Sequence, residues 1–129
     1  MNISREIPAP GRYTNQTPSG LFVCDFDGTL LRSDRSFSSA DLSALMRLGE
    51  LGIIRAVATG RSIYSINTVS ISELPVDFIL FSSGAGIVRH PDGAIIREVS
   101  LEPREVNRAI KVLQANNLDF MVPGESPGG

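Results

Sequence analysis

The sequence predicts an α/β protein whose core is a parallel sheet. Three short apolar segments, at 21–24, 53–57 and 76–82, have the length and composition of buried strands. Between the first two, apolar residues recur at helical spacing, and Gly52 follows the last of them. Strands that alternate with helices along a chain form a right-handed parallel sheet, which binds ligands beyond the carboxyl ends of its strands.

The first elements follow in order from about Gly20. Residues 1–19 carry several prolines and polar residues without periodicity, so we expect a flexible leader there. Ser38 or Ser39 can cap the first helix, and a second, less regular helix is expected over about 62–72. The apolar positions of the first helix are Leu42, Leu45, Leu48 and Leu51.

After the third strand the pattern changes to that of a hairpin. The apolar segments 86–89 and 94–97 flank a Pro-Asp-Gly turn at 91–93. His90 lies beside this turn, and we expect it to be a solvated loop residue, since the chain has no other histidine to share a metal site.

A second domain is expected to begin within the hairpin. We place the N-terminal part of the core at 20–90, and the hairpin with the start of the second domain at 91–129. Pro103 is a good first residue for an amphipathic helix that ends near Asn116, and 118–122 is expected to open a further strand.

Two carboxylates lie where the first strand is expected to end. Residues two apart in a strand face the same side, so Asp25 and Asp27 can converge near one point. Two such carboxylates repel unless a divalent cation lies between them or one holds a proton. Asp25 is therefore a candidate nucleophile for phosphoryl transfer and Asp27 a candidate acid/base. Gly28 permits close approach of backbone N–H groups to a phosphate, and Thr29 can donate a further hydrogen bond. The alternative is a plain Asp-Phe-Asp-Gly turn after a buried strand.

A second polar string, at 58–62, follows the second strand. It can be an ordinary strand-to-helix turn in which Thr59 or Ser62 caps a helix. A helix N-terminus is itself an anion site, so a capping role and a phosphate-binding role are compatible.

These strings resemble the motifs of the haloacid dehalogenase-like (HAD) phosphohydrolases. The string Asp25-Phe26-Asp27-Gly28-Thr29-Leu30 matches their D-x-D-G-T signature, and Ala58-Thr59-Gly60-Arg61-Ser62 resembles their second motif. The segment 30–38 is similar to the flap that follows the nucleophile in the Cof-like sugar-phosphate phosphatases of that superfamily. The resemblance implies a Rossmann-like core, represented here by its first three strands, followed by the start of an α/β cap domain.

The resemblance also implies a reaction. Members of the family hydrolyse phosphomonoesters with Mg²⁺, here expected to be a sugar phosphate or similar small metabolite, through an aspartyl-phosphate at Asp25. Asp27 would be the acid/base, and both aspartates would belong to the metal site. The family's threonine hydroxyl and next N–H hold the phosphate, a role that falls to Thr59 and Gly60. Arg61 either orients the substrate or the cap, or forms a surface ion pair.

The chain departs from the family's pattern in two places. Ser83 stands where the family has an asparagine, so it is not assigned to the site. The family's catalytic lysine and later acidic pair are not found, because the single lysine, Lys111, falls in the predicted cap helix and is expected to be solvated. We therefore expect an N-terminal fragment that is inactive as a monomer and associates through the unpaired edge of its sheet.

Two other function classes stay open. The chain could be a non-catalytic module that binds phosphate or pairs with a partner that supplies the remaining sheet. A phosphoacceptor domain of the response-regulator type also uses an aspartate at a strand end. Such domains carry paired acids on the first strand and the acceptor on the third, however, and the third strand here ends in Ser82-Ser83.

Composition argues against several classes of partner. A net charge of -2 with scattered arginines gives no basic surface for nucleic acid. No apolar run approaches the roughly 20 residues that span a bilayer, and no signal peptide is recognisable, so no membrane contact and a cytoplasmic location are expected. The single cysteine, Cys24, lies in the first strand and is expected to be a small buried hydrophobe.

Overall fold

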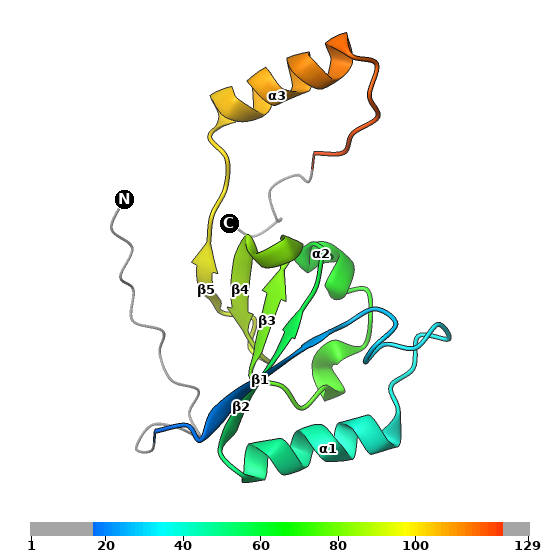
Figure 1. Ribbon diagram of the computed structural model, residues 1–129, viewed down its shortest axis with the longest axis vertical. Coiled ribbons are helices and arrows are strands. Elements are labelled where there is room, and N and C mark those ends of the chain that lie inside the picture. The colour runs from blue at the N-terminus through cyan, green and yellow to red at the C-terminus, as the bar shows by residue number, and fades with distance from the viewer. Residues whose placement is uncertain (1–16, 123–129) are drawn as a thin grey trace. The chain divides into compact units, whose positions relative to one another are not determined.

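The computed structural model describes residues 17–122, which form two units (Figure 1). The first unit extends to Glu98 and the second begins at Val99. Most of the predicted leader, and residues 123–129, lie outside the described residues. The units divide after the hairpin because its strands pair with the sheet of the first unit.

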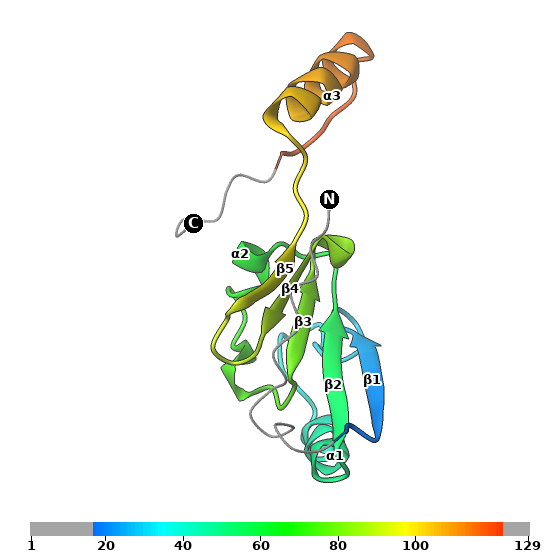
Figure 2. The ribbon, with the colours of Figure 1, turned by 90° about the vertical axis from the view of Figure 1, so that its left-hand side faces the viewer.

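Within residues 17–122 the sheet has five strands in the order β1-β2-β3-β4-β5, and Figure 2 shows β1 at one edge and β5 at the other. The strands are β1 (Gly20–Asp25), β2 (Ile53–Ala58), β3 (Phe78–Phe81), β4 (Gly86–Arg89) and β5 (Ile95–Glu98). The first three are parallel, as predicted, and the last two are antiparallel additions through a hairpin. The carboxyl ends of β1, β2 and β3 therefore share one edge of the sheet.

The first helix confirms the prediction from its apolar spacing. Helix α1 (Ser39–Glu50) begins after Ser38, whose hydroxyl accepts a 3.5 Å hydrogen bond from the Asp41 N–H. Gly52 follows the helix with φ +75°, a conformation that glycine adopts without strain. Leu45 is the fully buried contact of α1 with the core.

The predicted helix over 62–72 is shorter than expected. The structure has a single turn, α2 (Ile63–Ile66), and then a short 3-10 helix, Ile71–Glu73. The intervening residues are Asn, Thr, Val and Ser, all weak helix formers. The Thr68 hydroxyl donates a 2.7 Å bond to the Ser65 carbonyl and so competes with helix continuation.

The core lies on one face of the sheet, between the strands and the helical segments. Its fully buried side chains are Phe26, Val57, Ile66 and Ile79. Cys24 packs against this cluster and is partly buried. Burial, followed by the charges of Asp25 and Asp41, raises the pKa of its thiol above the ordinary value, which disfavours the thiolate form.

A buried ion pair joins α1, β2 and the segment before β3. Arg55 is 2% exposed and donates to the Asp77 carboxylate from Nε and Nη2 at 3.1 and 3.0 Å. Its Nη1 also donates to the Leu45 carbonyl at 3.0 Å. The pattern of apolar residues in β2 gave no indication of this pair.

The hairpin is confirmed, but the expectation for His90 is wrong. His90 is half-buried, and its Nε2 is enclosed with no hydrogen-bond partner in the described part of the chain. The backbone of His90 continues the strand pairing beyond β4, because its N–H donates to the Asp77 carbonyl at 2.9 Å. Burial lowers its pKa below 6.5.

In the second unit, helix α3 (Pro103–Ala115) begins at Pro103 as predicted. Glu102 and Glu105 form a capping box at its start. The strand expected at 118–122 is not formed: in the described part of the chain these residues pair with no strand, and an extended segment becomes a strand only by pairing with another. None of the helices in residues 17–122 is both long and apolar enough to cross a membrane.

Candidate active site

The end of β1 exposes two carboxylates on either side of a buried phenylalanine. Phe26 is 0% exposed, whereas Asp25 and Asp27 are both exposed. The chain reverses sharply here, because the N–H groups of Leu30 and Leu31 both donate to the Phe26 carbonyl, at 3.0 and 2.8 Å. The buried ring thus anchors a tight turn that presents both aspartates to solvent.

Gly28 and Thr29 shape this turn. Gly28 has φ +74°, a backbone conformation that other residues adopt only with strain. The Thr29 hydroxyl donates a long 3.4 Å bond to Asp25 Oδ2. Within residues 17–122 the Asp25 carboxylate makes no other hydrogen bond or ion pair with a side chain, so it remains open to a ligand.

The second motif lies beside the first at the same edge of the sheet. Asp25 pairs with Ala58 in the β1–β2 ladder, so Thr59 emerges next to the end of β1. Thr59 is 5% exposed, and its Oγ1 accepts a 3.1 Å bond from the Arg61 N–H. Ser62, rather than Thr59, caps the helix, accepting from the Ser65 N–H at 3.2 Å.

Arg61 joins the two motifs through Asp27. Its Nε lies 3.1 and 2.9 Å from the two carboxylate oxygens, and its Nη2 lies 2.7 Å from Oδ1. The guanidinium also stands over the Phe26 ring, 5.8 Å from its centroid. These hydrogen bonds from Arg61 hold the pKa of Asp27 below 3.8, so Asp27 is a carboxylate in this arrangement.

The structure adds a turn that the sequence analysis set aside. Ser82 and Ser83 have φ of +47° and +55°, uncommon values for residues other than glycine. Their N–H groups donate to the carbonyls of Arg61 and Thr59 at 2.8 and 3.0 Å. A Cβ placed on Gly60 would lie 3.6 Å from the Ser83 hydroxyl. The Ser-Ser-Gly string after an apolar strand was the available signal for this turn.

The residues near Asp25 fit part of a magnesium shell. Mg²⁺ prefers oxygen ligands and binds through one or two carboxylates together with phosphate and water. Asp25 offers an exposed carboxylate of this kind, while the Asp27 carboxylate is engaged by Arg61. In residues 17–122 no three acidic, histidine or cysteine side chains gather as a metal site would require. The donors are of the right type, and a bound phosphoryl group would supply more of them.

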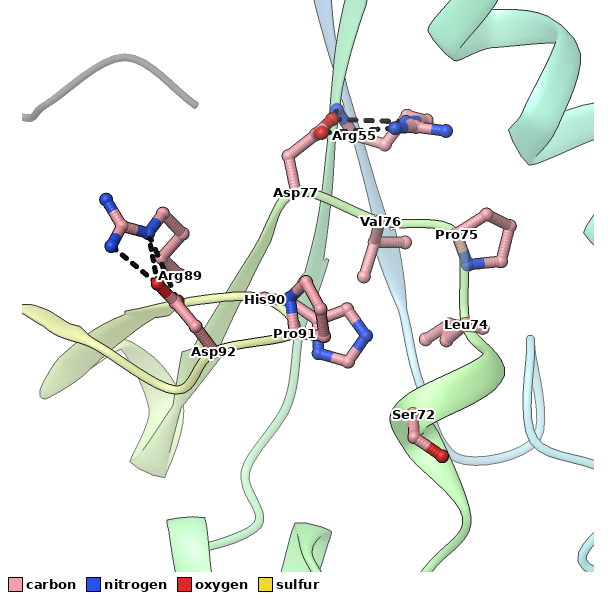
Figure 3. Close-up of a pocket in the computed structure, with 10 residues that line it drawn as sticks. All are labelled: Arg55, Ser72, Leu74, Pro75, Val76, Asp77, Arg89, His90, Pro91 and Asp92. Carbon is pink, nitrogen blue, oxygen red and sulfur yellow. Dashed lines mark hydrogen bonds and ion pairs between the residues drawn. The ribbon is translucent and has the colours of Figure 1, made fainter. Parts of the chain in front are cut away.

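Two hollows in the described part of the first unit are lined by residues outside these motifs. One, of about 500 Å³, is drawn in Figure 3 with Arg55, Asp77 and His90 in its lining. A neighbouring hollow of about 550 Å³ shares His90 with it. Asp77 precedes β3, so the first hollow is at the amino end of the parallel strands, opposite the edge that carries Asp25. Neither hollow is lined by a motif residue, so the candidate site lies at the carboxyl ends of β1 and β2.

A family model described as haloacid dehalogenase-like hydrolase matches residues 22–126. The chain belongs to this family of hydrolases.

Two of the proteins that the chain resembles are phosphatases. The chain is 29% identical over 84 residues to the HMP-PP phosphatase of Cronobacter sakazakii (strain ATCC BAA-894). It is similar in structure to BT1666 of Bacteroides thetaiotaomicron, a HAD superfamily phosphatase, with a TM-score of 0.66 and 25% identity. A haloacid dehalogenase-like hydrolase from B. subtilis gives a TM-score of 0.64 and 26% identity.

The chain spans well under half of these relatives. The match covers 65% of this chain and 30% of the Cronobacter protein. For the structures of BT1666 and the B. subtilis hydrolase it covers 88% and 75% of this chain, and 40% and 34% of theirs. The family model shows the family, and the solved structures show the fold of the region that the chain shares with them.

Proposed function

We propose that the chain is the N-terminal part of a Mg²⁺-dependent phosphatase that hydrolyses a small phosphorylated metabolite, most simply a sugar phosphate. The observation that carries this proposal is the pairing of Asp25 with Ala58, which brings the two motifs together at one edge of the sheet. Ligands bind at such an edge in open α/β sheets. The phosphatase relatives support the same class of reaction.

In this proposal Asp25 attacks phosphorus and forms an aspartyl-phosphate. Asp25 suits that role because it is exposed and, among the residues that the structure describes, is engaged only by the long bond from Thr29. Asp27, two residues on, protonates the leaving alcohol and later activates water. Its present contact with Arg61 favours the carboxylate, so proton donation requires that contact to loosen.

The phosphoryl oxygens would be held by the two turns. Gly28 and Gly60 let backbone N–H groups approach closely, and the Thr29 and Thr59 hydroxyls can donate hydrogen bonds. Mg²⁺, bound by Asp25 and by the segment at Asp27, would offset the negative charge that gathers at the phosphoryl group. Offsetting that charge is the largest requirement of phosphoryl transfer.

The 129-residue chain by itself is proposed to be inactive. Lys111, its single lysine, lies in α3 of the second unit, and nothing places it at the site. The cations that can then offset two aspartates and a phosphate dianion are Arg61 and a bound metal ion, without the lysine of the family's pattern. A cytoplasmic location and a lack of nucleic-acid partners remain predictions from the sequence.

The experiment that tests the proposal uses the longer protein and an aryl phosphate substrate. We expect Asp25→Asn to abolish turnover in Mg²⁺ while thermal unfolding stays unchanged, because an amide does not attack phosphorus and residue 25 is exposed. Glu50→Gln, which changes an exposed acid in α1, is the matched control and should keep full activity. Substantial turnover by Asp25→Asn would contradict the nucleophile assignment.

A non-catalytic module is the second candidate function. It is favoured by the position of β1 at the edge of the sheet, where a partner strand can pair, and by its exposed apolar side chains, Leu21 at 66% and Val23 at 47%, which such a partner can cover. The two candidates differ in one result. When the segment of a relative that carries the catalytic lysine is added to the chain, a non-catalytic module still binds phosphate or its partner without turnover, whereas the N-terminal part of a phosphatase gains turnover.

A further inference from the structure

The part of Arg61 best suited to phosphate is already occupied by Asp27. A guanidinium recognises a carboxylate or a phosphate most strongly through two parallel N–H donors. Nε and Nη2 of Arg61 provide such a pair, and both donate to the Asp27 carboxylate, at 2.9 and 2.7 Å. The remaining nitrogen, Nη1, faces Ser65, 3.4 Å from its hydroxyl and from its carbonyl oxygen.

The contact between Arg61 and Asp27 is of a kind that exchanges readily. The two side chains are 27% and 51% exposed, and ion pairs within reach of water gain little net free energy. The Phe26 ring beneath the guanidinium is fully buried and so forms a fixed platform. Arg61 can therefore change partners on this platform while Ser65 keeps it near the site.

A phosphoryl group would meet Arg61 at the same place. The Arg61 N–H is bonded to Thr59 Oγ1, so the base of its side chain belongs to the phosphate-binding turn itself. The backbone there is held by Ser82, whose N–H donates to the Arg61 carbonyl. The Asp27 carboxylate and a bound phosphate dianion would therefore accept hydrogen bonds from the same two donors, Nε and Nη2 of Arg61.

We propose that Asp27 and the phosphoryl group compete for Arg61, so that the empty site is closed by an internal ion pair which the substrate replaces. This inference rests on the proposed phosphatase function and deepens it. Arg61 is then a substrate-binding residue with two states: it holds Asp27 when the site is empty, and it holds phosphoryl oxygens when the site is filled. Release of Asp27 by the substrate leaves that carboxyl free at the moment when it must act on the leaving group.

The other arrangement is that Arg61 stays on Asp27 throughout and only orients it. The two differ in how residues 27 and 61 are coupled in phosphate binding. Under competition, removing the Asp27 charge frees Arg61 and tightens phosphate binding more than the loss of a like charge alone would. Under permanent pairing, the gain from Asp27→Asn is the same whether or not Arg61 is present.

A double-mutant cycle on the full 129-residue chain separates them. Inorganic phosphate is titrated without Mg²⁺, and binding is followed by the amide signals of Gly28 and Gly60 in NMR spectra. Four chains are compared: the natural one, Asp27→Asn, Arg61→Gln and the double variant. We expect Arg61→Gln to weaken binding, and the gain from Asp27→Asn to be about two- to five-fold larger with Arg61 than in the Arg61→Gln background, as for an exposed ion pair.

Arg89→Gln is the matched control, because Arg89 forms another exposed Arg–Asp pair, with Asp92, away from the site. It should leave phosphate binding unchanged. Equal gains from Asp27→Asn in both backgrounds, with binding intact, would overturn the competition and leave the phosphatase proposal standing. A complete lack of phosphate binding by the natural chain would overturn the phosphate site and the competition together. The amide oxygen of asparagine can still accept a hydrogen bond from Arg61. The cycle is therefore repeated with Asp27→Ala, which leaves Arg61 no acceptor at position 27.

Discussion

Replacing Asp77 by asparagine should destabilise the first unit more than any single change at its surface. Arg55 and Asp77 have side chains only 3% and 7% exposed. The Asp77 carboxylate accepts three bonds from Arg55, from the backbone N–H at 2.9 Å and from Nε and Nη2. The amide removes the negative charge and leaves the buried guanidinium uncompensated, which costs about 3–5 kcal/mol. Small domains are stable by roughly 5–15 kcal/mol, so the loss is a large share of the total stability.

Urea unfolding followed by circular dichroism measures this loss. With a denaturant slope of about 1.5 kcal/mol per M, a loss of about 3 kcal/mol lowers the midpoint by about 2 M. Glu50→Gln is the control, because the Arg47–Glu50 pair is exposed and its removal costs at most about 0.5 kcal/mol. Replacing both partners, as Arg55→Met with Asp77→Leu, should cost less than Asp77→Asn alone. Equal midpoints for Asp77→Asn and Glu50→Gln would refute the reasoning.

Three further predictions concern other parts of the first unit. The pKa of His90 is lower in the folded than in the unfolded chain, so the unfolded chain binds the proton more tightly. The contribution of neutral His90 to stability is therefore complete above about pH 6.5 and is lost as the pH falls toward the folded pKa. His90→Phe should flatten a plot of the unfolding midpoint against pH between about 5 and 7. Gly86→Ala should destabilise by about 1–3 kcal/mol in urea unfolding, since the new Cβ would overlap the Phe81 ring, whereas Gly20→Ala meets no atom within 4 Å and should be neutral. Val23→Lys should reduce self-association of the chain in light scattering, because a charge on an edge strand opposes pairing; an unchanged, concentration-dependent mass would place the association elsewhere.

The fold was predictable to the extent that local patterns decide it. The helix from Ser39 and the hairpin around Gly93 follow from caps, spacing and turn residues, which are local signals. The length of α2 was not predictable, because it depends on small differences in helix propensity among residues 67–70. The strand expected at 118–122 was not predictable either, because strand formation there depends on a partner segment. The buried Arg55–Asp77 pair joins positions 22 residues apart and leaves no periodic signal.

The site was predictable in its residues more than in their contacts. The two strings placed Asp25 and Thr59 at strand ends, and the parallel register brings those ends together. Sequence left open whether Arg61 orients a ligand or forms an ion pair, and in the structure it is paired with Asp27. Ser83 was set aside because it replaces an asparagine, yet its backbone N–H holds the Thr59 carbonyl. Such contacts depend on chain segments that meet only after folding.

The position of β1 gives the two halves of the site different local stabilities. In residues 17–122, β1 pairs only with β2, whereas β2 is flanked by strands on both sides. Amide hydrogens at a sheet edge open to solvent with a smaller free energy than those of interior strands. The turn that carries Thr59 should therefore be protected from hydrogen exchange for longer than the turn that carries Asp25. A segment or partner that paired with the outer edge of β1 would slow hydrogen exchange more at the turn of Asp25 than at the turn of Thr59. The local stability around Asp25 is therefore linked thermodynamically to binding at that edge.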